Sequence, residues 1–67
     1  MKWIRQYCNH HNLSIRHLPT DGTIILWDGK QRVGEVLEHG KYVKFKSGLI
    51  KSSDLATCII SNCKIHR

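Results

Sequence analysis

Residues 41–48 read Lys41-Tyr42-Val43-Lys44-Phe45-Lys46-Ser47-Gly48. Polar and apolar side chains alternate along this stretch with the period of a β-strand, whose successive side chains point to opposite faces of a sheet. Val43 and Phe45 share one face and can enter a core. Tyr42, Lys44 and Lys46 share the other face and can meet solvent or a ligand. The stretch therefore predicts an amphipathic strand with a basic and aromatic outer surface.

Turn signals divide the surrounding chain into further short strands. Asp28-Gly29 is a strong hairpin signal, and residues 19–22, which begin with the only proline, form another turn. His39-Gly40 and Ser47-Gly48 mark two more. Between these turns the sequence predicts five strands, at residues 23–27, 31–38, 41–46, 49–52 and 57–61. Residues 53–55 suit a single helical turn capped by Ser53.

The alternation is interrupted near Gly34. In a regular strand Val33 would share a face with Glu35, and Val36 would share the other face with Gly34. If Val33 faced the core, the carboxylate of Glu35 would then face it too. A β-bulge at Gly34 would place Val33 and Val36 on the same face. We therefore predict a bulge in the second strand.

Residues 1–18 precede the first predicted strand, and the first part of this segment is predicted to be helical. Trp3, Ile4, Tyr7 and Cys8 form an apolar stripe at helical spacing, and the helix is expected to end near His11 or Asn12. Residues 13–18 fit a short strand and a short second helix equally well. The expected core residues come from this helix and from the strands: Trp3, Ile24, Leu26, Val33, Val36, Val43, Phe45, Leu49, Leu55, Cys58 and Ile60.

Length and charge narrow the classes of function. The 67 residues make one small domain, comprising a helical segment (1–18), a β-barrel (23–61) and a basic tail (62–67). A chain of this size buries only about 60% of its unfolded surface, so a deep substrate cleft is not expected. Eleven Lys and Arg residues against five Asp and Glu give a net charge of +6, which favours polyanions, nucleic acid first.

The number of cysteines and the lack of long apolar runs indicate in which cellular compartment the protein is expected. Three cysteines cannot all pair within one chain, which favours a reducing environment. No run approaches the length of a secretory signal or a membrane span. We therefore expect a cytoplasmic protein without a membrane partner.

Five short strands joined by tight turns resemble the SH3-like small barrels, a group that includes KOW, Tudor and chromo-type modules and the C-terminal domains of retroviral-type integrases. The resemblance covers residues 23–61, and residues 32–36 (Arg-Val-Gly-Glu-Val) are similar to the Gly-x-Val step of KOW-type strands. It implies a five-stranded small barrel. Together with the helical segment before it, we therefore predict a mainly β fold, a five-stranded SH3-like small barrel with a short N-terminal helix.

A basic and aromatic strand face is the candidate functional site. Neighbouring strands of a small barrel would bring several cations and an aromatic ring together, the cations for phosphates and the ring for stacking on bases. Trp27 is a second candidate for stacking. The predicted nucleic-acid-binding residues are Lys30, Arg32, Tyr42, Lys44, Lys46 and Lys51. The ordinary alternative is that strand lysines only maintain solubility and discourage edge pairing.

Two other classes of binding remain open. Ile25 and Trp27 have the opposite parity to Ile24 and Leu26, and an exposed apolar strip of this kind would mark a protein-partner or homodimer surface. The partner-binding anchors would then be Trp3, Tyr7, Ile25 and Trp27. Alternatively, residues 1–18 resemble a helix–turn–helix DNA reader of excisionase or winged-helix type, with Ser14 capping a second helix and Arg16 reaching the groove.

Metal binding and catalysis receive little support. Cys8, His11, Cys58 and Cys63 are the right residue types for tetrahedral zinc, but Cys58 lies in a predicted strand and the Cys58–Cys63 spacing is loose. No nucleophile and base are spaced as a known catalytic set, and no glycine-rich phosphate loop occurs. We predict a binding protein rather than an enzyme, with no catalytic residue, no metal and no cofactor.

Overall fold

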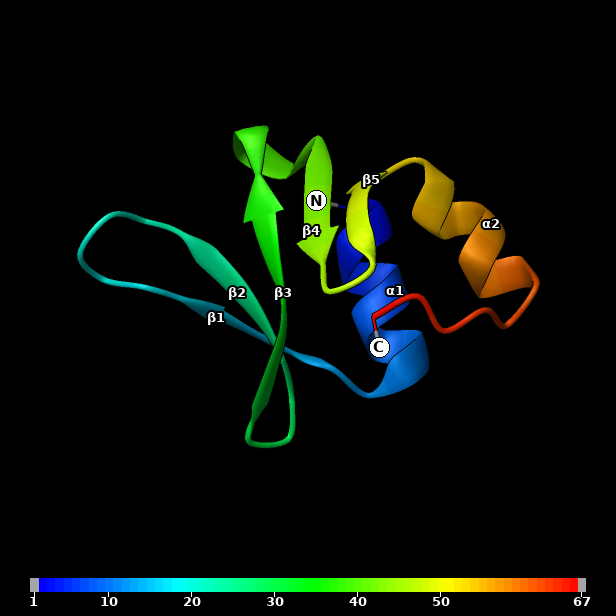
Figure 1. The fold of residues 1–67 in the computed structure, drawn as a ribbon, viewed down its shortest axis with the longest axis horizontal. Coiled ribbons are helices and arrows are strands. Elements are labelled where there is room, and N and C mark those ends of the chain that lie inside the picture. The colour runs from blue at the N-terminus through cyan, green and yellow to red at the C-terminus, as the bar shows by residue number, and fades with distance from the viewer. Residues whose placement is uncertain (1, 67) are drawn as a thin grey trace.

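The computed structural model describes residues 2–66 and is mainly β. Its five strands form one antiparallel sheet in sequence order, each strand pairing with the next along the chain (Figure 1). The strands are β1 (Ser14–His17), β2 (Ile24–Asp28), β3 (Gln31–Leu37), β4 (Tyr42–Phe45) and β5 (Gly48–Lys51). Helix α1 (Lys2–His11) precedes them, α2 (Asp54–Ile60) follows them, and a 3-10 turn, η1 (Glu38–Gly40), joins β3 to β4.

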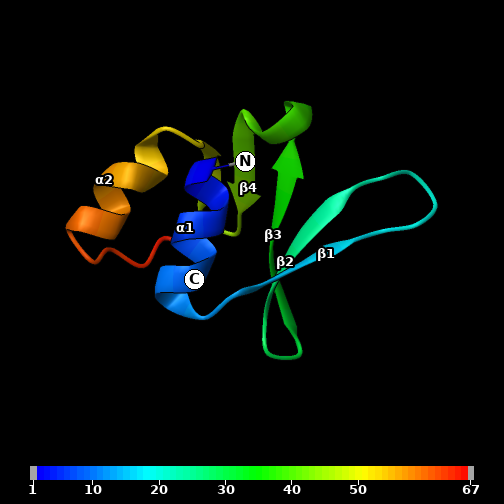
Figure 2. The same ribbon diagram turned by 180° about the vertical axis from the view of Figure 1, so that it is seen from behind.

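The sheet is open rather than closed. Among the described residues, β1 pairs only with β2 and β5 pairs only with β4, so the expected closed barrel is not formed. Helix α1 lies behind β4 and β5 in Figure 1 and in front of β4 in the reverse view of Figure 2. Helices α1 and α2 pack against each other, and α2 also touches β5. The two helices therefore cover one side of the sheet.

That covered side, the inner face, carries the core. Leu26, Val36, Val43 and Phe45 point inward from the strands and belong to one buried cluster with Leu55 of α2. Helix α1 contributes its buried stripe to the same cluster: Ile4, Tyr7 and Cys8. The alternation predicted for residues 42–45 is confirmed, because buried and accessible side chains alternate along β4.

The predicted irregularity in the second strand is present. Leu26 pairs with Gly34 but Trp27 pairs with Arg32, so Val33 is the extra residue of a β-bulge. Val33 packs against the core cluster, and Gly34, which is buried, shares its side of the sheet. Because Val33 and Gly34 both face inward, Arg32 and Glu35 on either side of them both face outward.

Gly34 is required at its position because an aromatic ring occupies the space of a side chain. It pairs with Phe45 across β3 and β4, and a Cβ atom on Gly34 would lie 2.8 Å from two ring carbons of Phe45. The large side chain of Phe45 therefore packs directly over Gly34, which has no side chain of its own. Phe45 is 3% exposed as a result.

Both helices end in the same way, with an asparagine in the left-handed conformation. At the end of α1, Asn12 has φ 59°, and the amide of Leu13 donates to the carbonyl of Cys8 at 2.8 Å. At the end of α2, Asn62 has φ 55°, and the amide of Cys63 donates to the carbonyl of Cys58 at 2.8 Å. These are Schellman motifs, which satisfy carbonyls that a helix end would leave unpaired. The predicted end of the first helix is confirmed.

The predicted fifth strand at residues 57–61 is wrong, because this segment belongs to α2. Its β-branched residues favour a strand locally, but residues Leu55, Cys58 and Ile59 recur at helical spacing and contact the core. Ser53 precedes α2 without forming a side-chain capping bond. The sheet still has five strands because residues 14–17, whose sequence fits a strand and a helix equally well, form β1.

Three expected core residues lie at the surface. Trp3 is 37% exposed, Leu49 is 59% exposed and Ile60 is 87% exposed. Leu49 has the opposite parity to the inward-facing Ile50, and Ile60 lies on the side of α2 away from the sheet cluster. Conversely, Ile25, expected in an exposed strip, is only 1% exposed.

The expected polar tail also departs from the prediction, because its last described residues pack onto α1. The amide of Ile65 donates to the hydroxyl of Tyr7 at 3.0 Å, and the same hydroxyl lies 2.8 Å from Nδ1 of His66. His66 is 5% exposed, and its ring lies 5.3 Å from that of His11. Tyr7 therefore ties the C-terminal segment to the first helix.

We expect Gly34→Ala to destabilise the fold by about 1–3 kcal/mol, because the added methyl group would overpack against the Phe45 ring. Urea unfolding at equilibrium measures the change. The matched control is the same substitution combined with Phe45→Leu, which removes the ring. The cost of adding the methyl group should be smaller in the Phe45→Leu background, and an equal cost in both backgrounds would contradict the packing argument.

We also expect stability to fall on acidification between about pH 7.5 and about 5.5. Burial lowers the pKa of His11 below its ordinary value of 6.5, and the charges of His10, His66 and Lys64 lower it further, whereas a backbone hydrogen bond at Cys63 raises it. The unfolded chain then binds the proton more readily, so stability is complete above pH 6.5 and is lost as the pH falls through the folded-state pKa.

The measurement is the free energy of unfolding at the two pH values for the parent chain and for His11→Gln. The variant should show a smaller loss on acidification. The control is His39→Asn, at an exposed position in η1 where asparagine tolerates the observed φ of 57°. If acidification still lowers the free energy of unfolding of His11→Gln but no longer lowers that of His39→Asn, His11 is not the responsible group.

Candidate nucleic-acid interface

The side of the sheet opposite the helices, the outer face, is built from cross-strand rows. The backbone pairing aligns one residue from each strand in a central row: Arg16, Ile25, Glu35, Lys44 and Leu49. Leu37, Tyr42 and Lys51 form a second row on one side of it. Trp27 pairs with Arg32 on the other side, beyond the bulge.

Five of the six predicted nucleic-acid-binding residues lie on or beside this face. Lys44 and Lys51 are exposed and Tyr42 is half-buried, as the alternation of the strands predicts. Lys46 follows β4 directly and is exposed, and Arg32 joins the face because of the bulge. Lys30 is exposed in the turn between β2 and β3, at the end of that hairpin.

The outer face also contains a cation and an aromatic ring whose pairing the sequence does not predict. The guanidinium of Arg16 lies 5.4 Å from the ring centroid of Trp27, within range of a cation–π interaction. The helix–turn–helix hypothesis places Arg16 in a second helix, but β1 places it on the sheet opposite Ile25. If residues 13–18 are assigned to a strand, strand alternation places Arg16 on the face opposite to that of Ile15 and His17, which is this outer face.

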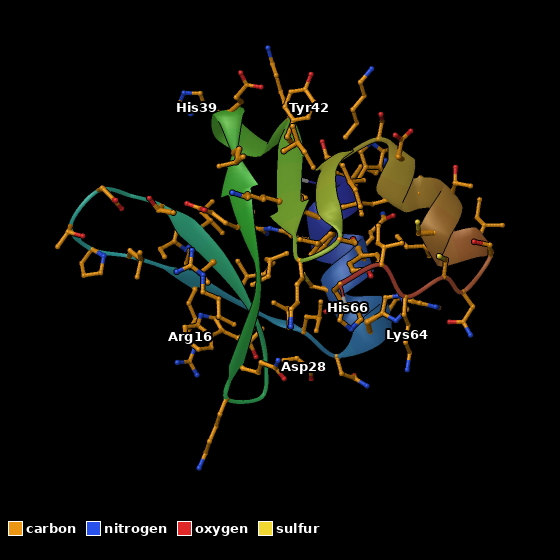
Figure 3. All side chains as sticks on the ribbon, viewed as in Figure 1. Arg16, Asp28, His39, Tyr42, Lys64 and His66 are labelled. Atoms are coloured by element: carbon orange, nitrogen blue, oxygen red, sulfur yellow. The ribbon has the colours of Figure 1, made fainter. Side chains whose placement is uncertain are left out.

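The face extends well beyond one cluster. Figure 3 shows Arg16 and Tyr42 toward opposite ends of the sheet, and Asp28 near the β2–β3 turn. The aromatic rings are therefore separated, one beside Arg16 and the other beside Lys51. A bound chain would have to cross β3 diagonally to meet both, because Trp27 lies on β2 and Tyr42 on β4.

Glu35 is the one carboxylate in these outer rows of described residues. Its oxygen lies 3.5 Å from the guanidinium of Arg32, and the two side chains are 32% and 55% exposed. Exposed ion pairs of this kind contribute little stability. The pair neutralises part of the local positive charge, and within residues 2–66 neither Lys44 nor Lys46 forms an ion pair.

An open hollow of about 330 Å³ lies between β3 and β4 at this place. Its lining includes Arg32, Glu35, Lys44 and Lys46, together with Val33, Gly34 and Phe45. Cations on flexible side chains around a depression suit phosphate oxygens, which approach from solvent. Both described helices lie on the inner side of the sheet, so neither projects from this surface to read bases.

The predicted partner-binding anchors are not exposed together. Ile25 and Tyr7 are 1% and 0% exposed, so neither can serve as a surface anchor. Trp27 is half-buried beside Arg16, and Trp3 lies in a different element, with the Lys2 ammonium 5.3 Å from its ring. The buried Ile25 lies outside the main core cluster, between Arg16 and Glu35.

The helix–turn–helix interpretation is also wrong in its central element. Ser14 and Arg16 belong to β1, paired with Trp27 and Ile25 respectively, so no second helix exists there to enter a groove. The alternation in residues 13–18 reflects strand pairing. Pro19, directly after these residues, leaves no length for a recognition helix.

Within residues 2–66, the four residues considered for zinc do not form a metal-binding group. Cys8 is 2% exposed, and burial raises the pKa of its thiol to about 11, so it is protonated at neutral pH. Cys58 and Cys63 are neighbours through the Schellman motif at the end of α2, while His11 packs against Tyr7 with ring centroids 4.5 Å apart. Within residues 2–66, no group of three or more ligand-type side chains has metal-binding geometry.

Comparison of the chain with protein-family models, curated proteins and solved structures finds no match. Among the described helices, neither is long and apolar enough to cross a membrane.

Proposed function

We propose that this protein is a non-enzymatic nucleic-acid-binding module that contacts the phosphate backbone through the outer face of its sheet. The supporting observation is the juxtaposition of Lys44, Lys46 and Lys51 with a half-buried aromatic ring, Tyr42, on the side of the sheet away from the two described helices. Only one carboxylate lies in the described rows of that face. The net charge of +6 acts in the same direction.

The binding residues fall into two groups by chemistry. Lysine and arginine side chains provide charge for phosphates, which gives affinity without sequence preference. Tyr42 and Trp27 provide flat rings for stacking on unpaired bases. The proposed charged group is Lys30, Arg32, Lys44, Lys46 and Lys51, with Arg16 added because of its place on β1.

The resemblance to SH3-like barrels is part of this proposal and rests on the four strands joined by short turns that the structure has within residues 23–61. Among the described residues β1 and β5 do not pair, so the sheet departs from a closed barrel at that edge.

We expect the double variant Lys44→Glu and Lys46→Glu to weaken binding at least tenfold, because it reverses two adjacent charges on the proposed face. The slope of log K against log salt should become shallower by about 1 for each phosphate that the variant no longer neutralises. Fluorescence anisotropy with random double- and single-stranded DNA and RNA measures both quantities at several salt concentrations.

The matched control reverses two charges away from the face, at Lys2 and Lys64, both exposed. It has the same net charge as the test variant. Equal weakening in the two variants would mean that net charge alone attracts the polyanion, and the assigned face would be wrong. Absence of saturable binding to all four nucleic acids at low salt would overturn the proposal itself.

A second substitution tests the same face in the opposite direction. Glu35→Gln removes the only carboxylate of the described outer rows and releases Arg32 from its 3.5 Å ion pair. Binding should tighten about two- to fivefold, with a steeper salt slope, because one further cation becomes available for phosphate. Glu38→Gln, at an exposed position in η1, is the control with the same charge change. Equal tightening in the control would argue against a local effect.

A further inference from the structure

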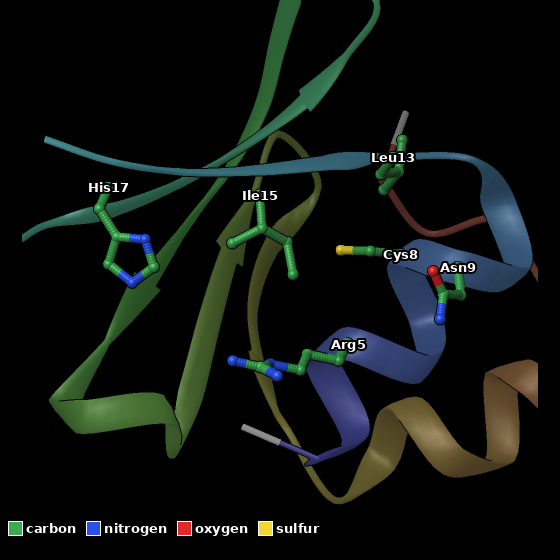
Figure 4. Close-up of a pocket in the computed structure, with 6 residues that line it drawn as sticks. All are labelled: Arg5, Cys8, Asn9, Leu13, Ile15 and His17. Atoms are coloured by element: carbon green, nitrogen blue, oxygen red, sulfur yellow. The ribbon is translucent and has the colours of Figure 1, made fainter.

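A second hollow lies on the other side of the molecule, between α1 and β1. It has a volume of about 440 Å³, within the range of ligand-binding clefts. Helix α1 contributes Arg5, Cys8 and Asn9 to its lining, and the chain leading into and along β1 contributes Leu13, Ile15 and His17 (Figure 4). None of these residues belongs to the proposed nucleic-acid interface.

The lining of this cleft combines an apolar part with a cationic part. Cys8 and Leu13 are 2% and 8% exposed, and the thiol of Cys8 is uncharged because burial raises its pKa to about 11. In Figure 4, Ile15 lies between His17 and Cys8, and Arg5 lies below them. Among the described residues, no carboxylate lines the cleft. A ligand that fits this chemistry has an apolar group beside a negative charge.

The strand that forms one wall of the cleft is also a sheet edge. Among the described residues, β1 pairs with β2 and with no other strand. An edge strand offers unpaired backbone donors and acceptors to another extended chain. Ile15 and His17 are two residues apart and line the cleft together, so a strand added beside β1 would direct its own alternate side chains toward the same hollow.

We propose that β1 binds an acidic, extended peptide segment of another protein by strand addition. The backbone of the peptide would pair with residues 14–17. One apolar side chain would enter the cleft over Cys8 and Ile15, and a carboxylate two residues away would meet Arg5 and His17. Backbone pairing with alternate side chains in pockets is a known mode of peptide recognition.

Charge complementarity selects this occupant over two others. A second copy of the chain also carries +6, and a two-fold antiparallel self-pairing of β1 centred on Arg16 would bring the two Arg16 side chains against each other. A nucleic acid would have to desolvate phosphates against the apolar part of the cleft, although an open cationic face lies elsewhere on the sheet. An acidic peptide satisfies the edge, the apolar part and the charge of Arg5 at once.

The test is an NMR titration of the ¹⁵N-labelled full chain with the blocked peptide acetyl-Thr-Val-Thr-Glu-Thr-amide, in which Val and Glu share a face. We expect saturable shifts in the amides of residues 13–17 and of Cys8, with a Kd on the order of 1 mM or tighter. The same peptide with Lys in place of Glu should bind at least fivefold more weakly. Shifts confined to Tyr42, Lys44 and Leu49, or no saturable shift, would overturn the proposal.

Two further comparisons test the geometry. In a strand, alternate amides point to the same edge, so N-methylation at Val and Glu and N-methylation at the three Thr residues block opposite edges of the peptide. One of these methylated peptides should lose binding and the other should retain it. If both bind as well as the parent, the peptide does not add as a strand, and the proposal is wrong.

The protein variant that tests the cationic part is Arg5→Glu, with Lys41→Glu as a control of equal charge change at an exposed position outside the cleft lining. Arg5→Glu should weaken the peptide by at least fivefold and Lys41→Glu by less than twofold. Equal effects would assign the binding to net charge and overturn the site. Both variants should retain nucleic-acid binding, so the two proposals fail or succeed separately.

Discussion

The packing of Phe45 over Gly34 is the contact on which the two faces of the sheet depend. Gly34 leaves room for the ring, which a Cβ atom would approach to 2.8 Å. The bulge at Val33 directs two consecutive residues inward, one to fill the core and one to leave space in it. Without that bulge, β3 would keep a simple alternation, and either Arg32 or Glu35 would face the helices. The same local irregularity therefore completes the core and sets the charge pattern outside.

The parts of the fold that follow from local pattern could be predicted from the sequence. The alternation in residues 42–45 and the Asp28-Gly29 turn have physical causes within a few residues, and both are confirmed in the structure. The bulge near Gly34 could be predicted because a buried carboxylate at Glu35 would be costly. The predicted helix end at Asn12 is confirmed, since asparagine tolerates a positive φ.

The errors have a common origin in tertiary contacts. Residues 57–60 have strand propensity, but packing of Leu55 and Cys58 on the core holds them in α2. The C-terminal residues look like a polar tail because their partner, the Tyr7 hydroxyl, lies 58 and 59 positions away in the chain. The position of Arg16 beside Trp27 depends on the pairing of residues 14–17 with β2. The lysines of the candidate interface were predictable because strand parity alone places them.

The two proposed surfaces are connected by β1, and that connection has a mechanistic consequence. Arg16 lies on the outer face over Trp27, whereas its neighbours Ile15 and His17 line the cleft behind the same strand. A peptide strand added to β1 would extend the sheet, so its outward side chains would lie next to Arg16 on the nucleic-acid side. Acidic residues at those positions would lower the local positive potential, and residues of other character would widen the surface available to nucleic acid. The coupling between the two ligands would therefore take its sign from the peptide's outward residues, not from any change in the fold.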